Sequence, residues 1–285
     1  MPFKKGDIVF SPANIAPLYL PKSKKLLLTL HDVSFITYKD TFSKPMRIYY
    51  NFVVPFNIKR ASKIITVSNS AKEEIQNYFP SSIGKIEVIY HGLDPIYKQN
   101  KMLKKKNQIL YVGSLNKRKN FVNVIKMFNM LNTDTTLKIV GNFSSNFDLD
   151  KQTQELIEKA KSDKNIIFVQ NITTTELIQT YNESKLFLYP SFYEGFGLPI
   201  LEAMGCGTPV LCSNTTSMPE VGGDAAIYVQ PDEVEDMLHK TKKILSDELL
   251  QKDMIEKGLL QSQKFTLDKM TKKHLDIFKR LVDEK

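Results

Sequence analysis

The stretch LFLYPSFYEGFGLPILEAMGCGTPVLC, residues 186–212, decides how this chain folds. Its apolar start at 186–189 predicts a buried parallel strand, which a proline stops. The glycines of the loop at 191–197 let backbone approach a ligand closely, and a short helix that opens with Pro199 follows. A second strand is expected at 208–212. The stretch therefore predicts a helix N-terminus at the carboxyl end of a sheet, where open α/β sheets bind phosphates.

Two carboxylates bracket the glycine loop, Glu194 and Glu202, in the spacing E-x7-E. The glycines and the proline between them prevent the pair from sharing one continuous helix. A carboxylate only accepts hydrogen bonds, so beside an anion site it suits sugar hydroxyls better than phosphate. On its own, the spacing also fits a solvated Glu194 and a Glu202 that caps its own helix.

The sequence YPSFYEGFGLPILEAMGCGTPV, residues 189–210, resembles the donor-site signature of the retaining glycosyltransferases of family 4. Members of this family have a GT-B fold with two Rossmann-like domains. Other motifs of the family occur here in the family's order: HDVSF at 31–35, RASKIITVSNSAK at 60–72, HGLDP at 91–95, YVGSLNKRKN at 111–120 and PEVGGDAAIYVQP at 219–231. The resemblance covers nearly the whole chain, and the combination of motifs is highly specific.

The resemblance implies roles for the residues in matching positions. Glu194 is expected to contact the transferred hexose, and Glu202 to accept hydrogen bonds from the ribose of the donor. His31, from the acceptor-side domain, is expected beside the donor sugar, where it hydrogen-bonds the sugar or supports the oxocarbenium-like state rather than acting as a general base. The remaining donor-binding residues are expected to be Arg118 and Lys119, which bind the pyrophosphate, and the backbone of Gly195, Phe196, Gly197 and Leu198. Ser114 stands where many members have arginine, and Arg118 is expected to compensate.

The implied reaction moves a hexose, of mannose type or similar, from a nucleotide-sugar to a polysaccharide or a lipid-linked glycan. The family retains the anomeric configuration, yet no carboxylate here can be assigned as a covalent nucleophile. The resemblance therefore implies attack from the same face, with the leaving phosphate helping to deprotonate the acceptor. The resemblance implies that no cofactor and no metal are needed in this scheme, and the sequence has no Asp-x-Asp pair with a plausible anchor.

Composition limits the class of protein. The 285 residues are 42% apolar, enough for two packed domains, and no stretch approaches the roughly 18 consecutive apolar residues of a membrane span. Because PFKKGD follows Met1 instead of a signal-peptide core, a cytoplasmic protein is expected. Cys206 and Cys212 are the two cysteines and are expected to be small core residues.

The positive charge is concentrated in the first part of the chain. Residues 1–106 hold 18 Lys and Arg against 7 Asp and Glu, a balance of +11, within a total of +9. Such a surface suits an acidic acceptor or the inner face of an anionic membrane, and it also fits a merely solvated lysine-rich surface. Nucleic acid is not expected, because no recognised reading module appears. The cations expected to meet a membrane are Lys22, Lys24, Lys25, Lys59, Arg60 and Lys63.

Strands and helices alternate along the chain, which predicts an α/β protein with GT-B-like, doubly wound parallel sheets. The predicted domains are a partial acceptor-side domain at 1–100, a nucleotide-sugar-binding domain at 101–265 after a polar linker at 98–107, and a helix at 266–285 that packs back towards the first domain. Lys44–Arg60 is expected to be a helix that Pro55 kinks or splits.

Because members of the resembled family begin with a strand, a glycine-rich turn and a helix ahead of the segment at Asp7, the first domain is expected to lack its opening β-α units. A natural short form, one piece of a split enzyme and a truncated reading frame are all compatible with this expectation. The unfinished sheet edge is expected to recruit a partner strand or a second copy. The alternatives to an active transferase are a non-catalytic module that binds a nucleotide-sugar, one subunit of a split enzyme and, more remotely, a GT-B isomerase or phosphorylase.

Overall fold

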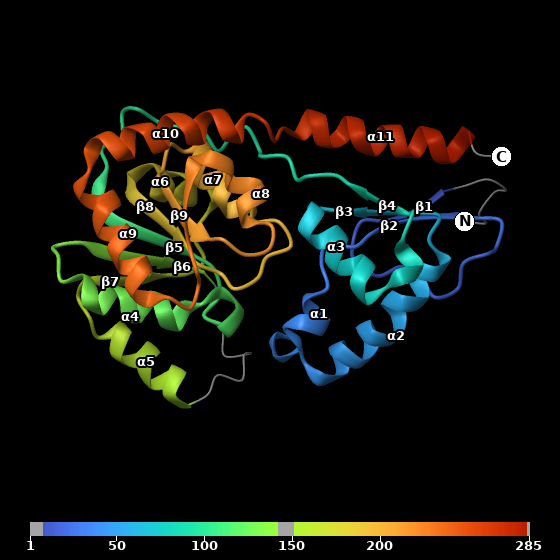
Figure 1. Ribbon diagram of the computed structural model, residues 1–285, viewed down its shortest axis with the longest axis horizontal. Coiled ribbons are helices and arrows are strands. Elements are labelled where there is room, and N and C mark those ends of the chain that lie inside the picture. Colours follow the sequence, from blue (N-terminus) through green and yellow to red (C-terminus); the bar gives the residue numbers. More distant parts are fainter. Residues whose placement is uncertain (1–7, 142–150, 284–285) are drawn as a thin grey trace. The chain divides into compact units, whose positions relative to one another are not determined.

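A computed structural model describes residues 8–141 and 151–283, in which two parallel sheets belong to two compact units (Figure 1). Unit 1 comprises Met1–Gly92 and Thr266–Lys285, and unit 2 comprises Leu93–Phe265. The sequence placed the boundary at residue 100. The chain after residue 92 already belongs to unit 2, and within this segment the backbone N–H of Asn100 donates to Asn182 Oδ1 at 2.6 Å.

Unit 1 has a four-stranded sheet in the order β1-β2-β3-β4, with every neighbouring pair parallel. Its helices α1, α2 and α3 cover one face of that sheet and α11 covers the other (Figure 1). The elements of unit 1 are β1 (Ile8–Ser11), β2 (Lys25–Thr29), α1 (Ser34–Thr37), α2 (Lys44–Arg60), β3 (Lys63–Thr66), α3 (Asn69–Tyr78), β4 (Ile86–Val88) and α11 (Leu267–Asp283).

The alternation of apolar side chains in β2 explains the two faces of this sheet. Leu26 and Leu28 pack in one cluster with Val54 of α2, whereas Leu27 packs in another with Ile277 of α11. The last helix of the chain therefore completes the core of unit 1, far in sequence from the strands that it covers.

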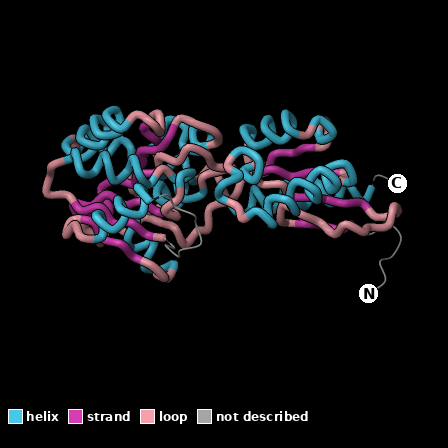
Figure 2. Tube along the Cα trace, turned by 90° about the horizontal axis from the view of Figure 1, so that it is seen from below, coloured by secondary structure: helices cyan, strands magenta, loops and turns pink. Residues whose placement is uncertain are grey.

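Unit 2 has a six-stranded parallel sheet in the order β10-β9-β8-β5-β6-β7. Figure 2 shows the strands of each unit enclosed by helices. The elements of unit 2 are β5 (Lys106–Val112), α4 (Phe121–Leu131), β6 (Thr136–Val140), α5 (Lys151–Lys161), β7 (Ile166–Val169), α6 (Thr174–Glu183), β8 (Ser184–Tyr189), α7 (Leu198–Gly205), β9 (Val210–Ser213), α8 (Met218–Gly222), β10 (Ala226–Val229), α9 (Val234–Ser246) and α10 (Glu248–Ser262).

The order of the strands in unit 2 reverses between β5 and β8. From β5 the chain moves outward through β6 and β7, and then it returns to β8 on the other side of β5 before continuing through β9 and β10. At such a switch point the loops that follow the two central strands diverge, and open α/β sheets bind ligands there. A ligand-binding site is therefore expected at the loop after β5 and the loop after β8.

Helix α2 runs unbroken from Lys44 to Arg60 across Pro55. The expected split does not occur, because a proline removes one hydrogen bond of the ladder and the remaining bonds hold the two halves together. The bond from the Ala61 N–H to the Asn57 carbonyl closes the helix at 2.8 Å. Within residues 8–141 and 151–283, no helix is both long and apolar enough to cross a bilayer.

Candidate functional site

Hydrogen bonds tie the two loops at the switch point of unit 2 to each other. Asn120 takes a left-handed conformation, with φ at 59°, and its side-chain amide donates to the carbonyl of Pro190 at 2.9 Å and to that of Pro231. In return, the N–H of Phe192 donates to the carbonyl of Arg118 at 2.9 Å. The loop that follows β5 is therefore held in register with the loop that follows β8.

The carboxylate of Glu194 lies between two cations from the loop after β5. Lys119 Nζ donates to Glu194 Oε1 at 2.6 Å, and Arg118 Nη1 donates to Oε2 at 3.0 Å. The same Arg118 nitrogen donates to the Tyr193 carbonyl at 2.9 Å. Lys119 Nζ also donates to the hydroxyl of Tyr189 at 2.7 Å. The structure thus brings together three of the predicted site residues in one cluster, which we call the Glu194 cluster.

Charge and burial together set the ionisation of the Glu194 cluster. Burial alone would raise the pKa of Glu194, but the charges of Lys119 and Arg118 outweigh it and hold that pKa below its usual value. Burial lowers the pKa of Lys119, the charge of Glu194 opposes this, and the charge of Arg118 adds to it. The three side chains carry one more positive than negative charge, so an anion that reached them would be attracted.

The glycine loop ends at the N-terminus of α7. Gly197, the residue before the helix, has φ at 103°, and a Cβ at this position would lie 3.2 Å from Ile200 Cδ1. Glycine alone fits this conformation without strain. Pro199 lies in the first turn of α7, where its missing N–H costs no hydrogen bond. The partial positive charge of this helix end adds to the excess charge of the Glu194 cluster, which precedes it in the chain.

A serine that the sequence did not suggest, Ser217, forms hydrogen bonds with the backbone of the glycine loop. Ser217 Oγ lies 2.9 Å from the carbonyl oxygen of Glu194 and 2.8 Å from that of Phe196. The N–H of Glu194 donates to Thr216 Oγ1 at 3.2 Å. The sequence signal for these residues was a polar run, NTTS at 214–217, directly after the strand β9.

Glu202 has different partners from Glu194. Its Oε2 accepts a hydrogen bond from the Tyr181 hydroxyl at 2.9 Å. Tyr181 lies near the end of α6, before β8 begins, whereas Glu194 lies in the loop that β8 leads into. Burial raises the pKa of Glu202, although hydrogen bonds from Tyr181 and Tyr97 oppose the shift. The expected contact of Glu202 with a ribose stays a prediction.

His31 belongs to unit 1, where it follows strand β2. Its backbone N–H donates to Asn14 Oδ1 at 2.9 Å, and its Nε2 lies 3.2 Å from the carbonyl of Pro12. The ring stacks on that of His91, with the centroids 5.6 Å apart. Burial, followed by the charges of His31 and His274, lowers the pKa of His91 to about 4. A contact of His31 with a donor sugar stays a prediction.

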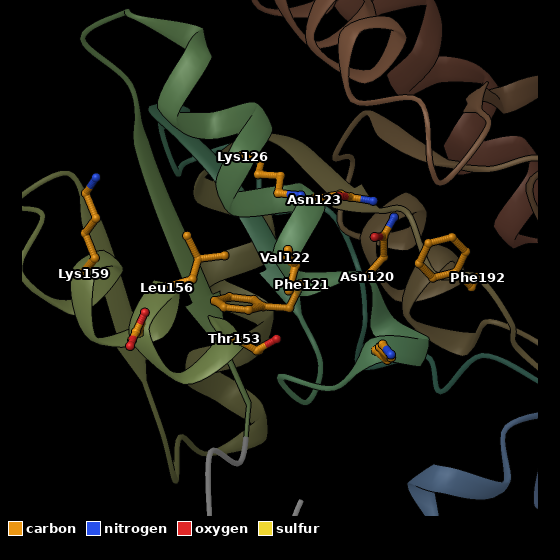
Figure 3. Close-up of a pocket in the computed structure, with 11 residues that line it drawn as sticks. Asn120, Phe121, Val122, Asn123, Lys126, Thr153, Leu156, Lys159 and Phe192 are labelled. Carbon is orange, nitrogen blue, oxygen red and sulfur yellow. The ribbon is translucent and has the colours of Figure 1, made fainter. Parts of the chain in front are cut away.

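A cavity of about 530 Å³ lies beside the loops of the switch point, between α4 and α5. Figure 3 shows the side chains of α4 and α5 around it, with Asn120 and Phe192 at one side. Lys117, Lys126 and Lys159 give its lining a positive charge. The cavity therefore adjoins the same two loops as the Glu194 cluster. Its described lining residues include none of the three charged side chains of that cluster.

Comparison with known proteins connects this geometry to a family. The family model described as "Glycosyl transferases group 1" matches residues 94–261, and the one described as "Glycosyltransferase Family 4" matches residues 5–96. The chain is 28% identical to the O-antigen chain mannosyltransferase B of Escherichia coli, over 92% of this chain and 72% of that protein. It is 30% identical to the O-antigen chain mannosyltransferase RfbU of Salmonella typhimurium, over 75% of this chain and 59% of that protein.

A solved structure shows the same fold. The crystal structure of Anabaena Alr3699/HepE in complex with UDP and glucose has a TM-score of 0.76 to this chain at 18% identity, and the match covers 90% of this chain and 72% of that one. The two family-model matches confirm the family resemblance found in the sequence. The two parallel sheets of the chain and this structural neighbour show that it has the GT-B fold. Because the group 1 family model matches residues 94–261, more than half of the chain, the chain belongs to the group 1 glycosyltransferases.

Proposed function

We propose that this chain transfers a hexose, mannose or a similar sugar, from a nucleoside-diphosphate sugar to a polysaccharide or lipid-linked glycan, with retention of the anomeric configuration. The observation that carries the proposal is the position of Glu194 between Arg118 and Lys119 at the switch point of unit 2. The mannosyltransferase relatives support the type of sugar, and the UDP and glucose of the HepE structure support a nucleotide-sugar donor.

The chemistry needs charge stabilisation more than it needs a nucleophile. The bond between the anomeric carbon and the diphosphate oxygen breaks, the acceptor hydroxyl oxygen bonds to that carbon on the same face, and its proton passes to the leaving phosphate. Negative charge develops on the diphosphate during this step. Arg118, Lys119 and the N-terminus of α7 supply the positive charge there, so the proposal assigns no metal and no other cofactor to the reaction.

Glu194 orients the sugar in this scheme. A carboxylate has about four acceptor positions, so an oxygen bound to Lys119 can still accept from a hexose hydroxyl. Glu202 is proposed to accept from the ribose. The backbone of Gly195, Phe196, Gly197 and Leu198 lines the diphosphate side. His31 is proposed to contact the donor sugar.

A lipid-linked acceptor places the protein at the cytoplasmic face of a membrane, with peripheral attachment. The charge of the first part of the chain supports this proposal, since residues 1–106 carry a balance of +11. Anionic headgroups attract such a surface by about 1 kcal/mol for each cation that comes close to them.

The direct test is donor turnover by the 285-residue chain. UDP- and GDP-hexoses are incubated with a mannoside acceptor, and the anomeric configuration of the product is read by NMR. We expect transfer with retention and a loss of about 100-fold in Glu194→Gln. The control is Glu183→Gln, which breaks an ion pair of similar length, Lys106 Nζ to Glu183 Oε2 at 2.6 Å, whose lysine is exposed and which lies away from the loops of the switch point. Binding of every donor without turnover would instead identify a non-catalytic module.

A further inference from the structure

Helix α2 is apolar on two sides. Val54 and Ile58 are fully buried in the core of unit 1. On another side of the same helix, Ile48 is 70% exposed, Phe52 69% and Phe56 45%. Three large apolar side chains of one helix, two of them aromatic, are therefore exposed to solvent.

The exposed residues form one stripe. Ile48, Phe52 and Phe56 recur at intervals of four, and Tyr49, 46% exposed, lies beside them at helical spacing. A helix that is apolar around its circumference is normally covered on all sides, and a contiguous exposed apolar patch marks a site of interaction. The stripe therefore needs an occupant that covers it.

The charge around the stripe is of one sign. Residues 41–72 contain six Lys and Arg and no Asp or Glu. Lys44 and Lys59 are exposed and lie near the two ends of α2, and Lys59 follows Phe56 by three residues, on the same side of the helix. We call Ile48, Tyr49, Phe52 and Phe56, together with Lys44 and Lys59, the α2 surface.

Other cations that the sequence suggested for a membrane are engaged within unit 1. Lys24 is only 3% exposed. Lys25 Nζ donates to the Leu281 carbonyl at 2.7 Å, and Arg60 Nη2 donates to the carbonyls of Pro21 and Lys24 at 2.8 and 2.7 Å. Of the suggested set, Lys22 in the loop before β2 and Lys59 on α2 remain exposed, so the attraction to an anionic surface does not draw on the whole set, and on α2 Lys59 combines with Lys44.

We propose that the α2 surface is the part of this chain that enters an anionic lipid bilayer. Phe52, Phe56 and Ile48 reach the boundary between headgroups and acyl chains, and Lys44 and Lys59 bind lipid phosphates. Aromatic and aliphatic side chains flanked by lysines are the composition of helices that lie in this interface. A second copy docking through the same surface would bring like charges together, which disfavours self-association. This inference rests on the proposed function in one respect, namely that the acceptor is linked to a lipid.

A tryptophan placed on the α2 surface tests this proposal, because the chain contains no tryptophan of its own. In Phe52→Trp, emission should shift to the blue when vesicles of phosphatidylcholine and phosphatidylglycerol are added, and lipids with brominated acyl chains should quench it. The matched control is Leu249→Trp on α10, where the native side chain is 77% exposed, and its emission should stay unchanged. No shift in Phe52→Trp, or an equal shift in both variants, would overturn the proposal.

Vesicle sedimentation measures the contributions of the stripe and of the lysines. The variant Ile48→Ser/Phe52→Ser/Phe56→Ser should bind the same vesicles at least roughly 100-fold more weakly, and Lys44→Gln/Lys59→Gln about 30-fold more weakly. Unchanged thermal unfolding shows that these exposed substitutions leave the fold intact. If the serine variant instead turns an oligomer into a monomer while vesicle binding persists, a second copy occupies the surface and the proposal is wrong.

Nucleotide binding without vesicles separates this inference from the proposed function. The serine variant should bind nucleoside diphosphates as the wild type does, since the Glu194 cluster belongs to unit 2. If the wild type binds vesicles through α2 but binds no nucleotide, the proposed function fails and the α2 surface stands. If it binds nucleotide but Phe52→Trp ignores vesicles, the α2 surface fails and the proposed function stands.

Discussion

At the scale of single residues, the hydroxyl of Tyr189 links the charged groups of the site. It accepts from Lys119 Nζ at 2.7 Å, and it forms a hydrogen bond with the carboxylate of Glu194. Burial and then the charge of Glu194 raise the pKa of Tyr189 well above its usual value. The phenol therefore stays protonated and donates to the carboxylate, which orients Glu194 and Lys119 before any ligand arrives.

Tyr189→Phe should keep the packing of the ring and remove these hydrogen bonds. We expect the free energy of unfolding to fall by about 1–2 kcal/mol, since buried charged groups lose a partner. The kcat/KM for donor turnover should fall about tenfold. The control is Tyr228→Phe, which removes a hydroxyl that donates to the Gly223 carbonyl at 2.6 Å. An equal loss of kcat/KM in the control would show that Tyr189 acts only on stability.

His91 should make unit 1 sensitive to acid. Its pKa is about 4 in the folded protein and about 6.5 when unfolded. As the pH falls from about 6.5 to about 4, the unfolded chain takes up a proton that the folded chain excludes, so stability is lost over this range and no further below it. Between about pH 7 and 5 the loss should be about 2 kcal/mol. Denaturant unfolding of His91→Gln should show a smaller loss, and an identical pH dependence in this variant would refute the assignment.

At the scale of elements, the sequence predicted the parts of the site that are local. The glycine loop before α7 and the basic turn after β5 are both present, and Glu194, Arg118 and Lys119 meet. The residues that hold these parts could not be read from the sequence. Asn120 and Ser217 act through hydrogen bonds to residues 70 and 23 positions away, and no local pattern encodes such contacts.

The turn into α7 should tolerate only glycine at position 197. Gly197→Ala should cost about 1–2 kcal/mol of unfolding free energy, because φ is at 103° and the new methyl meets Ile200. Donor binding should weaken as well, since the helix N-terminus shifts. The matched control is Gly84→Ala, where φ is at 80° and nothing lies within 4 Å of a Cβ. If calorimetry finds equal nucleotide affinity in both variants, the conformation of Gly197 does not contribute to nucleotide binding.

At the scale of the whole molecule, the alternation of strands and helices predicted two α/β units with a boundary at residue 100, and the compact units of the structure divide after Gly92. The polar run at 98–107 suggested a linker, yet its backbone bonds to α6 through Asn182, and β5 starts inside it at Lys106. Polarity marks exposure to solvent and does not report which unit a segment binds. Similarly, the sequence predicted a helix at Lys44–Arg60, but only the structure shows which of its apolar side chains lack a covering layer.

His31 belongs to unit 1 and the Glu194 cluster belongs to unit 2, which gives a prediction for His31. His31→Asn should leave the affinity for a nucleoside diphosphate unchanged, because the Glu194 cluster lies in unit 2. Transfer to the acceptor should fall by about 10- to 100-fold, since a group that supports the developing positive charge is lost. Steady-state transfer measured beside calorimetry checks this, and full transfer by the variant would remove His31 from the site.

Transfer should also persist in excess chelator, because Arg118, Lys119 and the α7 N-terminus supply the positive charge that a divalent cation provides elsewhere. The assay is donor turnover with and without EDTA after dialysis. Loss of activity in EDTA, restored by magnesium or manganese, would show that the cations of the chain do not suffice.

The central claim, that the Glu194 cluster holds the diphosphate of a nucleotide, is tested most directly by calorimetric titration of the 285-residue chain with UDP and GDP. We expect one site in the wild type and a loss of about tenfold or more in Lys119→Met and in Arg118→Met, since each loses a charge-assisted hydrogen bond. Lys117→Met, an exposed lysine of the same turn, should bind as the wild type does. Equal affinity in all four proteins, or no binding of either nucleotide by the wild type, would contradict the account.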